Sequence, residues 1–364
     1  KVGGTTSSGT PAWIHSFLQH CQKHSIPLDF ISSHSYPSDT RVDEFIDSIE
    51  QSVNISKHVN KPFFLSEYND GLGFGCCHDR SYAASFLVQM AYKLQTPPSR
   101  SGSNNIDHQY LAGMSYWTFS DIFEELYMDR DPFHNGYGLL TVDEIPKPAF
   151  RAFELLSAFP GIFYDSHITT IHTTAYDDGG VEGKKDEEEV TSFSGIVDEN
   201  QTGVHIQTFI TQFVPSDKMK SINTFSNVSL DYEYKFINSN VVDEKNDYFT
   251  CEMHVGYIDS NHTNPFEVWK NLNSPKPLIG NKKDTVFNAS KLQRTVVPCH
   301  DNLRASSNGN FEDGSEVAAG KENIDKFLTG SNGKTTLITF QHSFLLEVNA
   351  VIVIDVYINM KKKE

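Results

Sequence analysis

Short apolar segments typical of buried strands alternate with segments of helical spacing up to about Phe159, and this alternation restricts the fold most. The strand-like segments span residues 28–34, 63–67 and 112–119, and the helix-like segments span 13–24, 42–59, 82–94 and 148–159. Repeated β-α units of this length predict an α/β fold in which helices cover a parallel sheet.

The pattern changes after Phe163, where alternating short strands replace the β-α units. These strand-like segments span residues 204–213, 230–236, 250–258 and 348–358. They predict an appended β-sandwich, so we expect two domains, residues 1–163 and residues 164–364. Residues 177–189 are polar and acidic, and residues 302–333 are rich in Ser, Asn and Gly, so both are predicted to be long surface loops.

A carboxylate stands at the end of one predicted strand. Pro62 precedes the apolar run 63–65, and Ser66-Glu67-Tyr68-Asn69 follows at once. A charged residue where a buried strand stops is costly to place unless it faces a site at the carboxyl end of the sheet. A strand-terminal Glu pointing into water would also give this sequence, and this segment alone leaves both interpretations open.

The segment 112–119 has the same arrangement. Trp117 lies near its end, where a flat indole can form the floor of a sugar pocket, and Asp121, Glu124 and Glu125 follow. Carboxylates are good acceptors for sugar hydroxyls. An aromatic core strand followed by a solvated acidic loop is the alternative, but two strands with the same arrangement favour a shared site.

A series of motifs follows in order along this part of the chain. It comprises K-V-G-G at 1–4, P-L-D-F-I-S at 27–32, S-E-Y-N at 66–69, S-Y-W-T-F-S-D at 115–121, F-E-E at 123–125, G-Y-G-L at 136–139 and I-P-K-P at 145–148. The series resembles glycoside hydrolase family 39, the family of β-xylosidases and α-L-iduronidases, and is closest to the β-xylosidase branch. Ordered motifs of this kind are hard to obtain by chance. The remainder of the chain matches poorly.

The resemblance implies the C-terminal half of a (β/α)8 TIM barrel followed by a β-sandwich domain. It also implies an O-glycosyl hydrolase of the retaining, β-xylosidase-like type, with Glu67 as the catalytic nucleophile and no cofactor or metal. The substrate-binding residues that it implies are His34, Tyr36, Trp117, Glu124 and Glu125.

One part of the family's machinery is absent from this sequence. The resemblance places the general acid/base, a Glu after an Asn, on a strand that precedes the Lys1–Gly4 motif. Half a barrel would also expose open sheet edges and a broad apolar face. We therefore expect an N-terminal half as partner, either a separate chain after cleavage or a missing segment, with activity only in its presence. The alternative is a non-catalytic, glycosidase-like subunit that binds carbohydrate or is structural, and an iduronidase-like specificity is a third interpretation.

Charge and composition exclude several other classes. The formal charge of −17 argues against binding of nucleic acid, whose phosphates would be repelled. No apolar run is long enough to span a bilayer. No His/Cys spacing resembles a zinc site. The expected partners are a carbohydrate substrate and the other part of the barrel.

The sequons favour a secretory route, and the cysteines allow disulfides. The predicted N-glycosylation sites are Asn54, Asn200, Asn227, Asn261 and Asn288. In a chain that resembles this family they favour a secreted or lysosomal glycoprotein. The cysteine count of 5 is odd, so at least one thiol is free or pairs outside the chain. Cys21 is expected to be a buried thiol and Cys251 to pair with Cys299, while Cys76 or Cys77 could clip the loop after Glu67.

Overall fold

The computed structural model describes residues 1–5, 11–36, 42–71, 77–95, 109–122, 131–159, 163–165, 168–173, 190–199, 203–216, 225–238, 247–298 and 334–362. These residues form two compact units. The first unit comprises Lys1–Phe153, Val214–Ile222 and Thr263–Lys291, and the second comprises Glu154–Phe213, Asn223–His262 and Leu292–Glu364. The segment Thr263–Lys291 therefore groups with the first unit, whereas the predicted boundary at residue 163 counted it with the second domain.

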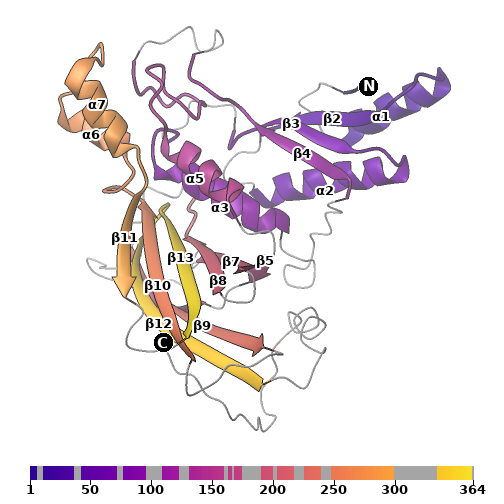
Figure 1. The fold of residues 1–364 in the computed structure, drawn as a ribbon. Helices are drawn as coiled ribbons and strands as arrows, with labels where there is room; N and C mark the ends of the chain where they lie inside the picture. Colours follow the sequence, from indigo (N-terminus) through magenta and orange to yellow (C-terminus); the bar gives the residue numbers. More distant parts are fainter. Residues whose placement is uncertain are drawn as a thin grey trace, which may run out of the picture. The chain divides into compact units, whose positions relative to one another are not determined.

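The first unit contains a parallel sheet whose strands lie side by side in the order of the sequence (Figure 1). Its strands are β1 (Gly3–Gly4), β2 (Phe30–Ser35), β3 (Phe63–Tyr68) and β4 (Leu111–Tyr116). The accompanying helices are α1 (Pro11–Lys23), α2 (Val42–His58), α3 (Ser81–Gln95) and α5 (Pro148–Ser157). The predicted α/β alternation and the parallel sheet are thus confirmed. Among the described residues the sheet is open, with β1 and β4 at its edges.

The spacing of apolar residues, every three to four positions in the helices and every second position in the strands, explains how these elements pack. The apolar stripe of α2, which includes Phe45, Ile46 and Ile49, is buried, and α2 contacts β3. On β3 itself the side chains alternate, because Phe63 is buried whereas Phe64 is 37% exposed. One face of the sheet is therefore packed, and the other keeps an aromatic side chain partly in solvent.

Two helices of the first unit were not predicted. These are α6 (Pro265–Asn271) and α7 (Gly280–Ala289). The Asn264 side chain caps α6 by accepting from the Glu267 N–H at 3.2 Å, and Pro265 occupies the first turn. Together with the segment 133–145, these helices enclose an apolar cluster. The buried residues of this cluster are Phe133, Ile145, Trp269, Leu278 and Val286.

The second unit is antiparallel. A six-stranded sheet has the order β11 (Gln293–Pro298), β10 (Asp247–Ile258), β13 (Val351–Lys362), β8 (Gly203–Thr211), β7 (Thr191–Glu199) and β5 (Phe163–Asp165). A three-stranded sheet has the order β12 (Lys334–Glu347), β9 (Phe225–Asn238) and β6 (Ile168–Thr173). Phe344 and Leu346 of β12 join the buried apolar cluster of the larger sheet. The predicted strands are confirmed, the β-sandwich stays a prediction, and both predicted long loops lie outside the described residues.

Cysteine states agree with part of the prediction. Cys21 is a buried free thiol, and Cys77 and Cys251 are disulfide-bonded. Cys76 and Cys299 lie outside the described residues, so the pairing of Cys251 with Cys299 stays a prediction. None of the helices in the described ranges is long and apolar enough to cross a bilayer.

Candidate active site

Glu67 lies near the carboxyl end of β3, and two polar side chains of the neighbouring chain segment meet it. β2 and β3 are parallel, and His34 lies opposite Glu67 in their register. The Tyr36 hydroxyl donates to Oε2 of Glu67 at 2.5 Å, and Nδ1 of His34 lies 3.1 Å from the same oxygen. The side chains of His34 and Glu67 are 20% and 25% exposed, so solvent still reaches this edge of the sheet.

This geometry gives Glu67 a fixed orientation. A phenolic O–H is a directional donor, and a hydrogen bond to a carboxylate is stronger than one between neutral groups. One carboxylate oxygen holds both partners, so the plane of the carboxylate is set by β2 as well as by β3. A carboxylate held in this way can act as an acceptor, a base or a nucleophile toward a bound molecule.

The backbone of Trp117 lies against the residues that follow Glu67. Its N–H donates to the Tyr68 carbonyl at 2.9 Å, and its own carbonyl accepts from the Asn69 side chain at 2.5 Å. The Asn69 side chain is buried, whereas the Trp117 residue is half-buried. The structure thus brings Trp117 to the end of β3. Glu124 and Glu125 lie outside the described residues.

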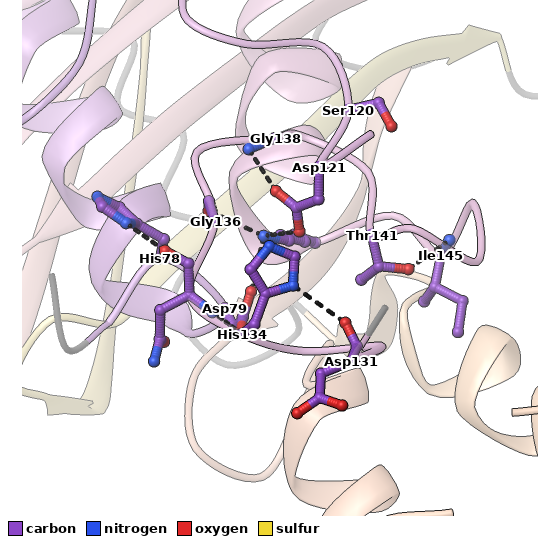
Figure 2. Close-up of polar contacts among 12 residues, drawn as sticks. His78, Asp79, Ser120, Asp121, Asp131, His134, Gly136, Gly138, Thr141 and Ile145 are labelled. Atoms are coloured by element: carbon purple, nitrogen blue, oxygen red, sulfur yellow. Dashed lines mark hydrogen bonds and ion pairs between the residues drawn. The ribbon is translucent and has the colours of Figure 1, made fainter. Parts of the chain in front are cut away.

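Asp121 does not lie where the sequence suggested. It was grouped with the acids expected to accept sugar hydroxyls, but its side chain is fully buried. One oxygen accepts from the Gly138 N–H at 2.7 Å, and the other lies 2.6 Å from Nζ of Lys147 (Figure 2). Inside the fold, the Lys147 ammonium offsets part of the cost of burying this carboxylate. The expectation for Asp121 was therefore wrong.

Lys147 is the centre of a buried ion cluster. Its Nζ lies 2.7 Å from Asp79 and 2.6 Å from Asp121, and it donates to the Gly136 carbonyl at 3.0 Å. All three charged side chains have no exposed surface. Burial lowers the pKa of Lys147, but the two carboxylates outweigh this, and the net pKa is raised. Burial raises the pKa of Asp121, which Lys147 offsets only in part.

Further polar contacts connect this cluster to the end of β3. Nε2 of His78 lies 2.6 Å from Asp70, and its Nδ1 lies 3.0 Å from the Asn135 carbonyl. Asp79, the next residue, accepts from the Asn135 N–H at 2.7 Å (Figure 2). The residues just after Glu67 are therefore fixed by groups from the turn that precedes α3 and from the segment around residue 135.

The sequence analysis assigned no function to Lys147, Asp79 or His78. The sequence carried a weak signal, because Lys147 lies between Pro146 and Pro148, two residues after the buried Ile145. A lysine in such a setting needs an anionic partner. Which carboxylates supply it depends on tertiary contacts that no local pattern shows. Within the described ranges, no group of three or more His, Cys, Asp or Glu side chains could hold a metal ion.

Comparisons with known proteins match this picture. The family model described as "Glycosyl hydrolases family 39" matches residues 1–180. A β-xylosidase from Caldicellulosiruptor saccharolyticus is 32% identical over 176 residues, which cover 44% of this chain and 33% of that protein. A β-xylosidase from Geobacillus stearothermophilus is 29% identical over 179 residues, which cover 43% of this chain and 33% of that protein. The match thus spans about a third of the length of these curated relatives.

Solved structures resemble the fold over nearly all of the chain. A crystal structure of a family 39 enzyme from Xanthomonas axonopodis pv. citri has a TM-score of 0.58 at 15% identity, and covers 98% of this chain and 60% of that one. A monomeric β-xylosidase from Caulobacter crescentus has a TM-score of 0.56 at 15% identity, with coverage of 98% and 61%. At this identity the likeness concerns the fold alone. The family match and the β-xylosidases related to the same region show that residues 1–180 of this chain belong to glycoside hydrolase family 39.

Proposed function

We propose that this chain is the carboxyl-terminal part of a retaining, β-xylosidase-like glycoside hydrolase in which Glu67 is the nucleophile. The observation that carries the proposal is the carboxylate of Glu67 at the end of a parallel strand, held by Tyr36 and His34. The family match over residues 1–180 and the β-xylosidases related to the same region support it.

In the proposed reaction the Glu67 carboxylate attacks the anomeric carbon, and the bond to the leaving oxygen breaks. A second carboxyl group protonates that oxygen, and then as carboxylate takes a proton from the water that hydrolyses the glycosyl-enzyme. The second group would come from the N-terminal part of the barrel. Retention of configuration requires the two carboxyl groups to be about 5–5.5 Å apart.

The remaining predicted site residues would hold the sugar. Trp117 would form the apolar floor, and Glu124 and Glu125 would accept hydroxyl donors. His34 and Tyr36 would orient Glu67 and contact the same sugar. Hydrogen bonds that strengthen toward the oxocarbenium-like transition state accelerate the reaction, whereas equal binding of substrate and transition state does not.

The same proposal assigns the parallel sheet to an incomplete barrel. The strands β1 to β4 would be later strands of a (β/α)8 barrel, and the second unit would be an accessory β-sandwich. The two sheet edges at β1 and β4, and the partly exposed Phe64 on the uncovered face, support the idea that further strands are needed. A separate N-terminal chain or a preceding segment would supply them.

We also propose a secreted or lysosomal glycoprotein. Three of the five sequons, at Asn54, Asn261 and Asn288, have exposed asparagines. Asn227 lies on β9, and Asn200 lies outside the described residues. Disulfides at Cys77 and Cys251 suit an oxidising compartment. Intact-mass measurement of the native protein before and after deglycosylation tests this, and an unchanged mass would contradict it.

The catalytic proposal is tested with Glu67→Gln in the complete protein that contains this chain. The amide keeps the shape of the side chain but is too weak a nucleophile, so turnover of an aryl β-xyloside should fall by several orders of magnitude with little change in Tm. Glu267→Gln is the matched control, because it makes the same chemical change on the surface of α6. Near-normal turnover by Glu67→Gln would remove Glu67 from the mechanism. Binding of xylo-oligosaccharides by a wild type that has no turnover would favour a non-catalytic subunit.

A further inference from the structure

We propose that the buried cluster of Asp79, Asp121 and Lys147 is a positioning device that sets the place of Trp117, the proposed sugar floor. The inference rests on the proposed function. The cluster itself is shielded from solvent, so its residues act through the backbone that they hold and not by contact with the sugar.

One connection runs from Lys147 through Asp121. The N–H of Asp121 donates to the Leu140 carbonyl at 2.9 Å, and the Leu140 N–H donates to the Phe119 carbonyl at 3.0 Å. The Thr118 carbonyl accepts from Leu139 at 2.9 Å. The segment 118–121, which directly follows Trp117, is thereby paired with the segment 137–140. The ion pair between Asp121 and Lys147 fixes the end of the segment 118–121 that lies away from Trp117.

The second connection runs through Asp79. Its neighbour His78 contacts Asp70 at 2.6 Å, and the Asp70 N–H donates to the Asn69 side-chain oxygen at 2.8 Å. The side-chain nitrogen of Asn69 donates to the Trp117 carbonyl at 2.5 Å. Both connections thus start at Lys147 and meet at the Trp117 backbone, one at its carbonyl and the other at the residue that follows it.

Two glycines show how closely the backbone is packed at this point. A Cβ at Gly138 would overlap the backbone of Ser120 and Asp121, and a Cβ at Gly136 would overlap the Asp121 carboxylate. The segment carrying Asp121 therefore has little room to shift while the cluster is intact. A rigid support of this kind is what a binding platform needs, because small displacements reduce binding and turnover.

The charge balance also argues for a role other than stability alone. Two carboxylates and one ammonium are buried together, and burying such groups costs about as much as their attraction returns. Apolar residues of similar volume would fill the same space without this cost. The ion cluster instead fixes a single arrangement of three chain segments, at residues 79, 121 and 147.

The test compares Asp121→Asn and Asp79→Asn with Asp355→Asn in the complete protein. Asp355 is the matched control, because it is a buried carboxylate that contacts Arg294 and His205 in the second unit. Each variant is assayed on an aryl β-xyloside well below its own Tm, with active sites counted by covalent labelling. Asp121→Asn and Asp79→Asn should lower kcat/KM by roughly 10- to 100-fold, with most of the loss in KM, because Glu67 and its partners do not touch the cluster.

Asp355→Asn should lower Tm and leave KM unchanged. If both cluster variants lower Tm but keep KM within about twofold of wild type, the cluster is only structural and the inference is overturned. If only one of the two cluster variants folds, the KM of that variant decides between a positioning role and a purely structural role. Wild type and Glu67→Gln are measured alongside. An inactive wild type would count against the proposed function, whereas an active wild type with unchanged cluster variants would count against this inference alone.

Discussion

A single oxygen atom of Glu67 receives both of the contacts that orient it. The hydrogen bond from the Tyr36 hydroxyl to Oε2 is the shorter contact, at 2.5 Å, and Nδ1 of His34 lies 3.1 Å from the same oxygen. A donor fixed in this position holds the carboxylate and leaves its other oxygen available for the proposed attack on the sugar. The contribution of Tyr36 is therefore expected to be larger for turnover than for folding.

Tyr36→Phe removes only the hydroxyl. Hydrogen bonds to charged groups contribute about 1.5–3 kcal/mol, so kcat should fall by about 10- to 100-fold while Tm changes little. Steady-state kinetics on an aryl β-xyloside measure this. Tyr110→Phe is the control, because its hydroxyl makes a long 3.3 Å contact with Asn60 at the surface. Equal kcat for Tyr36→Phe and wild type would show that the hydroxyl does not assist Glu67.

His78 should make stability depend on pH. Burial lowers its pKa, but the hydrogen bond and charge of Asp70 outweigh this, so the folded pKa lies above the ordinary 6.5. The stability from the protonated ring is fully present below pH 6.5 and is lost as the pH rises through the folded pKa. The Tm difference between wild type and His78→Gln should therefore be larger at pH 6 than at pH 9. A difference that grows toward alkaline pH would contradict this sign.

The site was partly predictable from single residues. Glu67 stands at a predicted strand end, whereas His34 and Tyr36 were named from the family resemblance. Parallel strands bring their carboxyl ends to one edge, which agrees with the contacts that the three side chains make. Asp121 also follows the end of a predicted strand, but its side chain is buried in an ion pair with Lys147. Since Lys147 is 26 residues further along the chain, only tertiary structure shows the pairing.

Among the elements, α6 and α7 differ most from the sequence analysis. They lie between the predicted strands 250–258 and 348–358, in a stretch for which the sequence pattern predicted no helix. Asn264-Pro265 with Glu267 was a readable helix start. By contrast, α2 has a long, clear helical period and β3 has a compact apolar run, and both matched their predicted bounds within two residues. Short helices whose stability comes from packing leave a weaker pattern.

The packing of α6 and α7 against the 133–145 segment can be measured. Trp269 is 6% exposed in a cluster with Phe133 and Ile145. Trp269→Ala should cost about 3–5 kcal/mol of unfolding free energy, because it leaves a large cavity. Phe287→Ala on α7 is the control, since its side chain is 39% exposed, and it should stay within about 0.5 kcal/mol of wild type. Denaturant unfolding gives both values, and equal values would contradict the packing.

For the whole molecule, the open parallel sheet predicts dependence on further strands. The edges at β1 and β4 and the exposed face around Phe64 should make residues 1–364 expressed alone bind an apolar dye and aggregate. Coexpression with an N-terminal polypeptide of the same protein should restore a cooperative thermal transition. A soluble monomer that melts sharply without any partner would show that the half-barrel proposal is wrong.

Covalent trapping tests the central claim most directly. A 2-deoxy-2-fluoro-β-xyloside with a good leaving group should form a glycosyl-enzyme with the complete protein, because the fluorine slows both formation and hydrolysis of the intermediate, whereas the good leaving group speeds only its formation. After proteolysis, mass spectrometry should find the added fluoroxylosyl group on the peptide that contains Ser66-Glu67-Tyr68, with fragmentation placing it on Glu67. A label on any other carboxylate, or turnover with inversion and no label, would contradict the account.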